Sequence, residues 1–345
     1  MQEFVWIGHF RGISGFTTAT REYFKAILPY FENLKLASLE VLKDDDPLHE
    51  YRAELPLKET EIKIVNHLPT TDPTAQAFLS VWEFDHIPER WVRIFNQADV
   101  IMTQSTFCRD VFAKQIDDPS KIHLAPYIIP SHFKPDGSAL RYFPDDKCVF
   151  GSVFDWVPRK VPGRTIQAFT QEFSEEEDAR LVMRTSYPHG VELSEIKNTI
   201  NKDSRITIIE EKIPDIDSFY RGIDVYISAT AGEGWGQTLT EAMVSGVPTI
   251  ASRHSGNLDF MNDENSFLVE VHDWSPVPDS TDFKWKLPKI NSIKKRMREV
   301  YSLWEQNGGD TSKLDRVQNA LKLKDQLTRK KIGEKIADLL HETFD

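Results

Sequence analysis

Short hydrophobic runs alternate along the chain with longer segments in which hydrophobic residues recur every three or four positions. In the first half, runs rich in β-branched and aromatic residues predict strands at Phe4–Ile7, Leu34–Val41, Ile62–Val65, Phe78–Trp82, Val100–Thr103 and Ile122–Ala125. The periodic segments predict helices at Thr17–Leu28, Arg90–Asn96 and Thr106–Lys114. Strands that alternate with helices in this way indicate a parallel sheet that is covered on both faces.

The alternation is interrupted at Lys134–Lys147, where prolines, a glycine and aspartates give the composition of a linker. Beyond it, strands are predicted at Cys148–Phe154, Arg180–Thr185, Ile206–Glu210, Asp224–Ser228, Pro248–Ala251 and Phe267–Val271. The helical segments are about Gly163–Phe173, near Leu193–Asn201, Asp215–Tyr220, Thr238–Ser245 and the charged stretch Ile290–Leu340. We therefore predict an α/β protein with two Rossmann-like, doubly wound parallel-sheet domains, at residues 1–140 and 147–320. A C-terminal helix at 321–345 could pack back across either domain, including the first.

Composition and charge narrow the class of protein. Of the 345 residues, 40% are hydrophobic and 28% charged, which suits a folded protein and excludes disorder for most of the chain. The formal net charge of −12 argues against a nucleic-acid partner. Two cysteines without a CxxC pair offer no disulfide framework and no cysteine zinc site, which favours a reducing compartment. Since neither a signal peptide nor an apolar stretch of ~18 residues is found, we expect a cytoplasmic protein without an integral membrane segment.

The segment most informative about chemistry is residues 229–248, between a predicted strand and a predicted helix. Three glycines at alternate positions precede a helix that is expected to start near Gln237, so the unpaired backbone N–H groups of its first turn offer an anion site. Glu233 lies in the loop, and Glu241 lies about one turn into the helix. Carboxylates accept hydrogen bonds from sugar hydroxyls, so one can hold a hexose and the other a ribose. Taken alone, the glycine loop is equally well explained as a tight turn.

The stretch EGWGQTLTEAMVSGVPTIAS, with seven residues between its two glutamates, resembles the signature of the retaining glycosyltransferases of family 4, the glycosyl transferases group 1. Further resemblances follow in order along most of the chain, in GHFRGISGFTTATRE, WVRIFNQADVIMTQSTFCRDVF, KIHLAPYIIPSHFKP, FGSVFDWVPRKVPGRTIQAF and HSGNLDFMNDENSFLVE. The resemblance implies the GT-B fold, in which two Rossmann-like domains face each other across a cleft and C-terminal helices pack back. The first domain would bind the acceptor and the second the donor.

The family's functional roles can be carried to matching residues in the second half of the chain. The resemblance implies that Glu233 contacts hydroxyls of the donor sugar, that Glu241 binds the donor ribose, and that Lys160, with Arg159 beside it, clamps the diphosphate. It further implies backbone contacts to the donor from Trp235, Gly236, Gln237, Thr238 and, near the base, Ile213. A leaving nucleoside diphosphate develops negative charge, which nearby cations stabilise.

Two candidates lie in the first half of the chain. Gly15 resembles the loop glycine whose N–H approaches the phosphate or the acceptor, although any strand-to-helix turn favours a glycine there. His86 resembles the family's cleft histidine near the donor's C6 hydroxyl, and Glu83 and Asp85 compete for that position.

The chain departs from the family pattern next to the Arg-Lys turn. Val153 stands where the family has a second basic residue, and Arg184, at the end of the next predicted strand, is our candidate to replace it. Val161 stands where a glycine normally follows the lysine, so the turn can differ in geometry.

We therefore expect transfer of a sugar from a nucleoside diphosphate sugar to an acceptor hydroxyl, with retention of configuration and with no metal or other cofactor. The acceptor can be a glycan, a protein or a lipid-linked compound, and the acidic charge of both halves favours a soluble or protein-presented one. The resemblance implies that a diphosphate oxygen helps to deprotonate it. A sugar-nucleotide epimerase and a non-catalytic sugar-nucleotide-binding subunit are the alternatives. An NAD-dependent dehydrogenase is disfavoured, because glycines at 8, 12 and 15 do not fit G-x-G-x-x-G.

Overall fold

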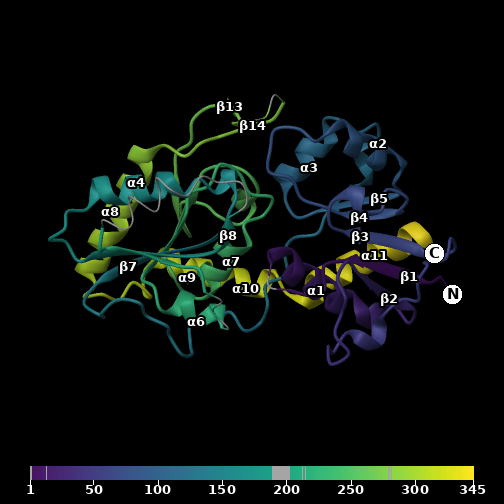
Figure 1. Ribbon diagram of the computed structural model, residues 1–345, viewed down its shortest axis with the longest axis horizontal. Helices are drawn as coiled ribbons and strands as arrows, with labels where there is room; N and C mark the ends of the chain where they lie inside the picture. Colours follow the sequence, from purple (N-terminus) through teal and green to yellow (C-terminus); the bar gives the residue numbers. More distant parts are fainter. Residues whose placement is uncertain are drawn as a thin grey trace. The chain divides into compact units, whose positions relative to one another are not determined.

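The computed structural model describes residues 2–12, 14–188, 203–211, 213, 215–278, 280 and 282–345 (Figure 1). Contacts within the chain divide it into two units. Unit 1 comprises residues 1–130 and 325–345, and unit 2 comprises residues 131–324. Each unit contains a six-stranded sheet in which every strand pair is parallel. The predicted fold class is therefore confirmed.

The sheet of unit 1 has the strand order β2-β1-β3-β4-β5-β6. Its strands are β1 (Phe4–Gly8), β2 (Leu34–Ser38), β3 (Ile62–Asn66), β4 (Ala77–Leu79), β5 (Val100–Thr103) and β6 (Ile122–Leu124). Its helices are α1 (Gly15–Ile27), α2 (Glu89–Gln97), α3 (Thr106–Ala113) and α11 (Arg329–Phe344), with short 3-10 helices at Leu28–Tyr30, His49–Tyr51, Pro69–Thr71 and Pro119–Lys121. Each strand predicted for this half overlaps an observed strand, because the hydrophobic runs are buried.

The last helix of the chain, α11, packs against α1 within unit 1. Arg329 at the start of α11 donates two hydrogen bonds to the Glu22 carboxylate, at 2.5 and 2.8 Å. Gly333 lies so close to α1 that a Cβ atom there would come within 2.3 Å of the Ala26 carbonyl oxygen. The two helices therefore meet at a point where only a glycine fits.

The sheet of unit 2 has the order β12-β11-β10-β7-β8-β9. Its strands are β7 (Cys148–Trp156), β8 (Ala179–Pro188), β9 (Ile206–Ile209), β10 (Val225–Ser228), β11 (Thr249–Ser252) and β12 (Phe267–Val269). The helices are α4 (Pro162–Glu172), α6 (Ile216–Arg221), α7 (Gln237–Val244), α8 (Ile290–Gln306) and α9 (Asp315–Leu321), with 3-10 helices at Pro158–Lys160 and Gly256–Asp259. Helix α10 (Leu323–Gln326) spans the boundary between the two units in the sequence. A hairpin of β13 (Ser275–Pro276) and β14 (Lys284–Trp285) was not predicted, because two-residue strands leave no periodic pattern. The helix predicted near Leu193–Asn201 lies outside the described residues.

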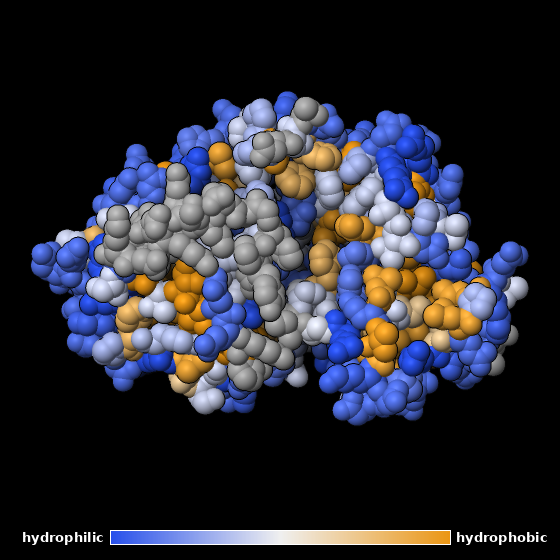
Figure 2. All heavy atoms as spheres, viewed as in Figure 1, coloured by the Kyte–Doolittle hydropathy of each residue, from blue (hydrophilic) through white to orange (hydrophobic). Residues whose placement is uncertain are grey.

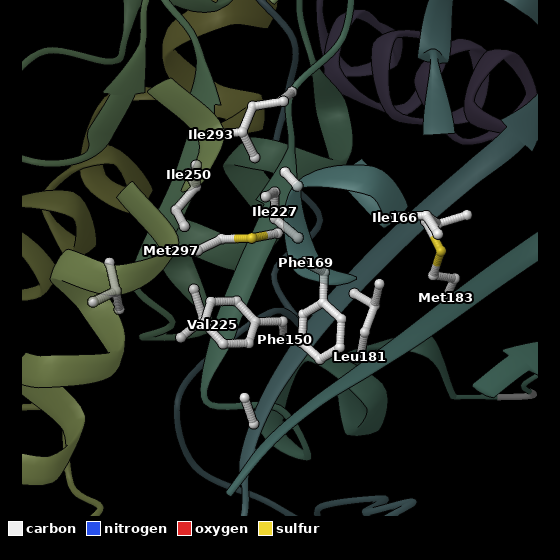
Figure 3. Close-up of a cluster of buried hydrophobic side chains, with 14 of the residues drawn as sticks. Phe150, Ile166, Phe169, Leu181, Met183, Val225, Ile227, Ile250, Ile293 and Met297 are labelled. Atoms are coloured by element: carbon white, nitrogen blue, oxygen red, sulfur yellow. The ribbon is translucent and has the colours of Figure 1, made fainter. Parts of the chain in front are cut away.

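A large hydrophobic cluster fixes one face of the unit 2 sheet (Figure 3). Phe150, Leu181, Val225 and Ile227 come from the strands, Ile166 and Phe169 from α4, and Ile293 and Met297 from α8. Side chains alternate between the two faces of a strand, so Val153 points away from the face on which Ser152 and Phe154 lie. The predicted linker also packs on this unit, where the Leu140 N–H donates to the Ser218 carbonyl at 2.8 Å.

The outer surface mixes hydrophilic and hydrophobic side chains. On the face drawn in Figure 2, hydrophilic residues cover much of the periphery and hydrophobic residues gather in smaller patches. Among the described residues, no helix is both long enough and apolar enough to cross a membrane.

Candidate active site

The candidate residues of unit 2 meet at the carboxyl ends of two neighbouring strands, β7 and β10. The turn after β7 carries Arg159 and Lys160, and the loop after β10 carries Glu233 and leads into α7. The Ala231 N–H donates to the Arg159 carbonyl at 2.8 Å, so the two segments are joined directly. Ligands of open parallel sheets bind at this edge.

Glu233 lies between two cations. The Lys160 Nζ donates to its Oε1 at 2.6 Å, and the Arg159 Nη1 donates to its Oε2 at 3.1 Å. Arg159 Nη1 also donates to the Gly232 carbonyl at 3.1 Å. The Glu233 residue is only 5% exposed, so this is a buried ion-pair network in which each charge depends on the others.

The ion pairs determine the protonation of this carboxylate. Burial raises the pKa of Glu233, but the charges of Lys160 and Arg159 outweigh burial and hold the pKa below its usual value. At neutral pH the site therefore contains one carboxylate and two cations, with a net positive charge that suits an anionic ligand.

The backbone of Glu233 is held by a residue that the sequence did not single out. The Glu233 N–H donates to the Ser255 Oγ at 2.8 Å, and the Gly256 N–H donates to the Glu233 carbonyl at 2.9 Å. Ser255 has a φ of 74°, which an L residue rarely adopts. The sequence feature that could have identified Ser255 is its position beside Gly256 in the motif HSGNLD, where the family pattern has two glycines.

Helix α7 starts abruptly at Gln237, because Gly236 adopts a φ of 101°. A Cβ atom on Gly236 would come within 2.8 Å of the Leu239 side chain. The preceding Trp235 is buried, and its ring packs against Phe260 at a centroid distance of 4.8 Å. The side chain of Trp235 thus packs in the core.

Glu241 lies on the buried side of α7, next to a tyrosine from another helix. The Tyr220 hydroxyl of α6 donates to the Glu241 Oε2 at 2.8 Å. Tyr220 is fully buried and Glu241 is 8% exposed, so the carboxylate is held in one orientation. No sequence pattern links these two residues, and Tyr220 was not predicted.

Arg184 stands beside Val153 in the sheet. The two residues are register partners on β8 and β7, so their side chains point to the same face of the sheet. The Arg184 Nε is buried and has no hydrogen-bond partner among the residues that the structure describes. Its charge also reaches Tyr142, whose pKa burial raises and Arg184 lowers in part.

A small pocket lies at the same carboxyl edge of the sheet. Lys160 contributes to its lining, together with Ser152, Phe154, Pro162, Thr165, Met183, Ser228, Ala229 and Thr230. Val161, beside Lys160, has a φ of 40°, so the turn adopts the left-handed conformation without the family's glycine.

Three predicted residues belong to other segments of the chain. Gly15 is the first residue of α1 in unit 1, where the Ser14 side chain caps the helix. His86 follows β4 in unit 1, and its Nδ1 lies 3.1 Å from the Asp85 carboxylate. Ile213 is buried in unit 2, and both residues beside it lie outside the described ranges.

The described residues contain no group of three or more His, Cys, Asp or Glu side chains that could hold a metal ion. The chain has three consecutive aspartates at 44–46 and two aspartates at 215 and 217, but one aspartate of each set pairs with an arginine. Asp46 pairs with Arg21 at 2.9 Å, and Asp217 pairs with Arg221 at 2.7 Å.

The family model that matches this chain and the solved structures that resemble it are all of glycosyltransferases. Residues 147–279 match the model of the family described as glycosyl transferases group 1. HepE from Anabaena, solved with UDP and glucose, has a TM-score of 0.72 and 13% identity, covering 99% of this chain and 100% of that chain. WaaG, a glycosyltransferase involved in lipopolysaccharide biosynthesis, has a TM-score of 0.73 and 12% identity, and the match covers 97% of this chain and 99% of that chain. A glycosyltransferase from Rickettsia africae has a TM-score of 0.68 and 15% identity, and the match covers 100% of this chain and 99% of that chain. No curated protein matches the sequence.

The solved structures show that this chain has the GT-B fold. Its segment 147–279 matches the glycosyl transferases group 1, which confirms the resemblance found in the sequence.

Proposed function

We propose that the protein transfers a sugar from a nucleoside diphosphate sugar to an acceptor hydroxyl, with retention of the anomeric configuration. The observation that carries this proposal is the buried carboxylate of Glu233, held between Lys160 and Arg159 at the carboxyl edge of the unit 2 sheet. Such a site offers an acceptor for sugar hydroxyls and cations for a diphosphate within a few ångströms of each other.

The diphosphate leaves as an anion when the glycosidic bond breaks. Lys160, Arg159 and the backbone N–H groups at the start of α7 would stabilise that charge without solvent reorganisation. These groups are sufficient to propose catalysis that does not depend on a metal. Because no carboxylate nucleophile is evident among the residues that the structure describes, we propose departure and attack on the same face of the sugar.

Glu241 would bind the ribose of the donor. Its carboxylate is oriented by the hydrogen bond from Tyr220, and carboxylate oxygens accept hydrogen bonds from adjacent hydroxyls such as those of a ribose. HepE was solved with UDP-glucose, so UDP-glucose is the first donor to test. The acceptor would be a glycan, a protein or a lipid-linked alcohol, and a cytoplasmic location stays a prediction.

A thermal-shift measurement with UDP, ADP, GDP and their glucose conjugates tests the proposal. A nucleotide at 100 times its Kd stabilises the folded state by about 2.7 kcal/mol, which is a shift of several degrees. We expect one base to give this shift and Glu241→Gln to weaken binding roughly tenfold, since it removes a charged hydrogen bond worth about 1.5 kcal/mol but keeps an oxygen for Tyr220. Glu59→Gln, at an exposed position of unit 1, is the matched control.

Absence of any shift at saturating nucleotide would contradict the proposal. Conversion of the donor to its epimer in the absence of an acceptor would indicate the epimerase instead. Slow release of free UDP without epimerisation is the result expected of a transferase.

Arg184 would contact the donor phosphates from β8. It would thereby replace the basic residue that the family has on the neighbouring strand, at the position of Val153. Replacement by methionine keeps most of the apolar stem and removes the charge. We expect Arg184→Met to weaken UDP binding roughly 10- to 100-fold, as for one hydrogen bond to a charged group, and to leave uridine binding unchanged. Isothermal titration with both ligands measures this difference. Arg180→Met, on the same strand, is the control, and an equal loss for uridine would show that Arg184 does not act on the phosphates.

A further inference from the structure

The connection between β12 and α8 leaves the carboxyl edge of the unit 2 sheet and forms the hairpin of β13 and β14 (Figure 1). At the base of the hairpin, the His272 N–H donates to the Leu287 carbonyl at 2.8 Å, so the two arms of the connection run side by side. One arm carries Trp274, just before β13, and the other carries Lys286, just after β14. Connections at this edge of a parallel sheet are where ligands bind.

The arm with Lys286 contacts the loop after β10, which carries Glu233. The Lys286 N–H donates to the Ala231 carbonyl at 3.4 Å. The Ala231 N–H in turn donates to the Arg159 carbonyl at 2.8 Å. One residue of this loop therefore joins the hairpin to the turn that holds the cations of the proposed donor site.

The arm with Trp274 contacts the loop after β11. The Trp274 ring lies nearly perpendicular to the His254 ring, at a centroid distance of 5.1 Å. The next residue, Ser255, accepts a hydrogen bond from the backbone N–H of Glu233 at 2.8 Å. Both arms of the hairpin thus rest on segments that hold Glu233 in place.

Lys286 is a cation that is held at both ends. Its backbone bonds to Ala231, and its Nζ stands over the Trp274 ring, 5.2 Å from the ring centroid. No carboxylate among the described residues pairs with this ammonium. Because a long side chain loses conformational entropy when it is ordered, an ammonium that the protein already positions binds an anion more tightly.

The buried groups around Lys286 add no second positive charge. Burial, and then the charge of Lys286, lower the pKa of His254 to about 4, so this ring is neutral near pH 7. Glu270, at the start of the same connection, pairs with Arg253 at 3.0 Å. A single ammonium matches the charge of a carboxylate, whereas a phosphate dianion would keep an unbalanced charge.

The order of the strands separates Lys286 from the cations proposed for the diphosphate. In the sheet order β12-β11-β10-β7-β8, Arg184 lies on β8 and the Arg159 turn follows β7. Glu233 follows β10, and the hairpin follows β12, on the side of β10 opposite to β7 and β8. A ligand with its diphosphate beside β7 and its sugar beside Glu233 would therefore meet Lys286 on the side of its sugar.

We propose that Lys286, positioned by Trp274, binds the carboxylate of an acidic sugar, a hexuronate, next to the sugar position at Glu233. The Nζ would donate a charge-assisted hydrogen bond to the carboxylate. Both the transferred sugar and the sugar that accepts it are sources of this carboxylate, because the two meet at the bond that is formed. The inference rests on the proposed function and names its substrate class. Trp274 is a positioning residue, since it acts through Lys286.

Isothermal titration of the full chain with UDP, UDP-glucose and UDP-glucuronate tests the transferred sugar. If this sugar is the acidic one, we expect UDP-glucuronate to bind roughly 10- to 100-fold more tightly than UDP-glucose, as for one hydrogen bond to a charged group. Lys286→Met should abolish this difference and leave the affinity for UDP unchanged. Lys289→Met, at an exposed position of the same connection, is the matched control and should preserve the difference.

Nitrogen-15 NMR of the full chain, labelled in tryptophan and saturated with UDP, tests the accepting sugar. The probes are methyl glucuronide and methyl glucoside, and Trp274→Phe assigns the Trp274 indole resonance. If the accepting sugar is the acidic one, we expect methyl glucuronide to move this resonance and methyl glucoside to leave it in place. Lys286→Met should remove the response.

The role of Trp274 is tested by two replacements. Trp274→Phe keeps an aromatic face for the ammonium and should preserve most of the preference for the glucuronate. Trp274→Leu should lower that preference roughly two- to fivefold, as for the loss of one exposed cation–π contact, with the affinity for UDP unchanged. A merely structural role would instead weaken UDP and UDP-glucose to the same extent.

Two results would overturn the inference. One is an equal loss of affinity for UDP in Lys286→Met, which would assign Lys286 to the diphosphate. The other is that neither experiment shows a preference for a glucuronate that depends on Lys286, while UDP still gives its thermal shift. In both cases the proposed function stands. If UDP gives no thermal shift, the proposed function fails and this inference fails with it.

Discussion

Replacement of Lys160 by methionine is expected to lower the turnover number of sugar transfer by roughly 100- to 1000-fold, comparable with the loss of one donor to a developing oxyanion. The Lys160 Nζ lies 2.6 Å from the Glu233 carboxylate, and its side chain is 12% exposed. The change would remove the cation that we propose for the leaving diphosphate, and it removes one of the two cations that hold the pKa of Glu233 below its usual value. The measurement is single-turnover release of UDP from UDP-glucose.

Two further variants make this result specific. Lys160→Arg keeps a charge at the site and should recover part of the rate, although its planar guanidinium cannot reproduce the position of an ammonium. Lys294→Met removes a lysine from α8, where it lies 3.9 Å from Glu172, and should leave the rate unchanged. Normal turnover in Lys160→Met would contradict its assignment to the diphosphate.

Replacement of Gly333 by alanine is expected to lower the free energy of unfolding by about 3 kcal/mol, at the upper end of the cost of overpacking. In an exposed helix the same change would stabilise by about 1 kcal/mol. Here the added Cβ would lie 2.3 Å from the Ala26 carbonyl oxygen and 2.7 Å from its carbon, which are backbone atoms of α1. The two helices must separate, and the ion pair between Arg329 and Glu22 is strained with them. Urea denaturation measures the loss.

Gly163→Ala is the matched control for this prediction. Gly163 lies in the first turn of α4, and a Cβ atom there would have no described atom within 4 Å apart from its chain neighbours and the backbone of its own helix. Its replacement should raise the free energy of unfolding slightly or leave it unchanged. If both alanine variants were equally stable, the close approach of α11 to α1 would be disproved.

The strands of the two six-stranded sheets could be predicted because they are short hydrophobic runs that are largely buried. The loop around Glu233 could be predicted because its glycines and glutamates have a fixed spacing. The contacts that complete these features join residues that no local pattern connects. Tyr220 reaches Glu241 from another helix, and Ser255 holds Glu233 from 22 positions away.

Unit 1 provides a second example. His9 precedes Glu40 by 31 positions and His67 by 58 positions, so only the parallel sheet brings the three side chains together. In the sequence, His9 is as readily explained as a solvated loop residue. Hydrophobic runs do not encode the order of strands in the sheet, and it is this order that places His9 beside Glu40 and His67.

The division of unit 1 into residues 1–130 and 325–345 affects how the chain folds as it is synthesised. The ribosome delivers every residue of unit 2 before it delivers α11, although unit 2 comes later than most of unit 1. Until α11 emerges, the surface of α1 around Ala26 lacks its covering helix. Unit 2 is therefore the first unit whose whole sequence has been synthesised. Unit 1 can finish folding only after all of unit 2 has been synthesised.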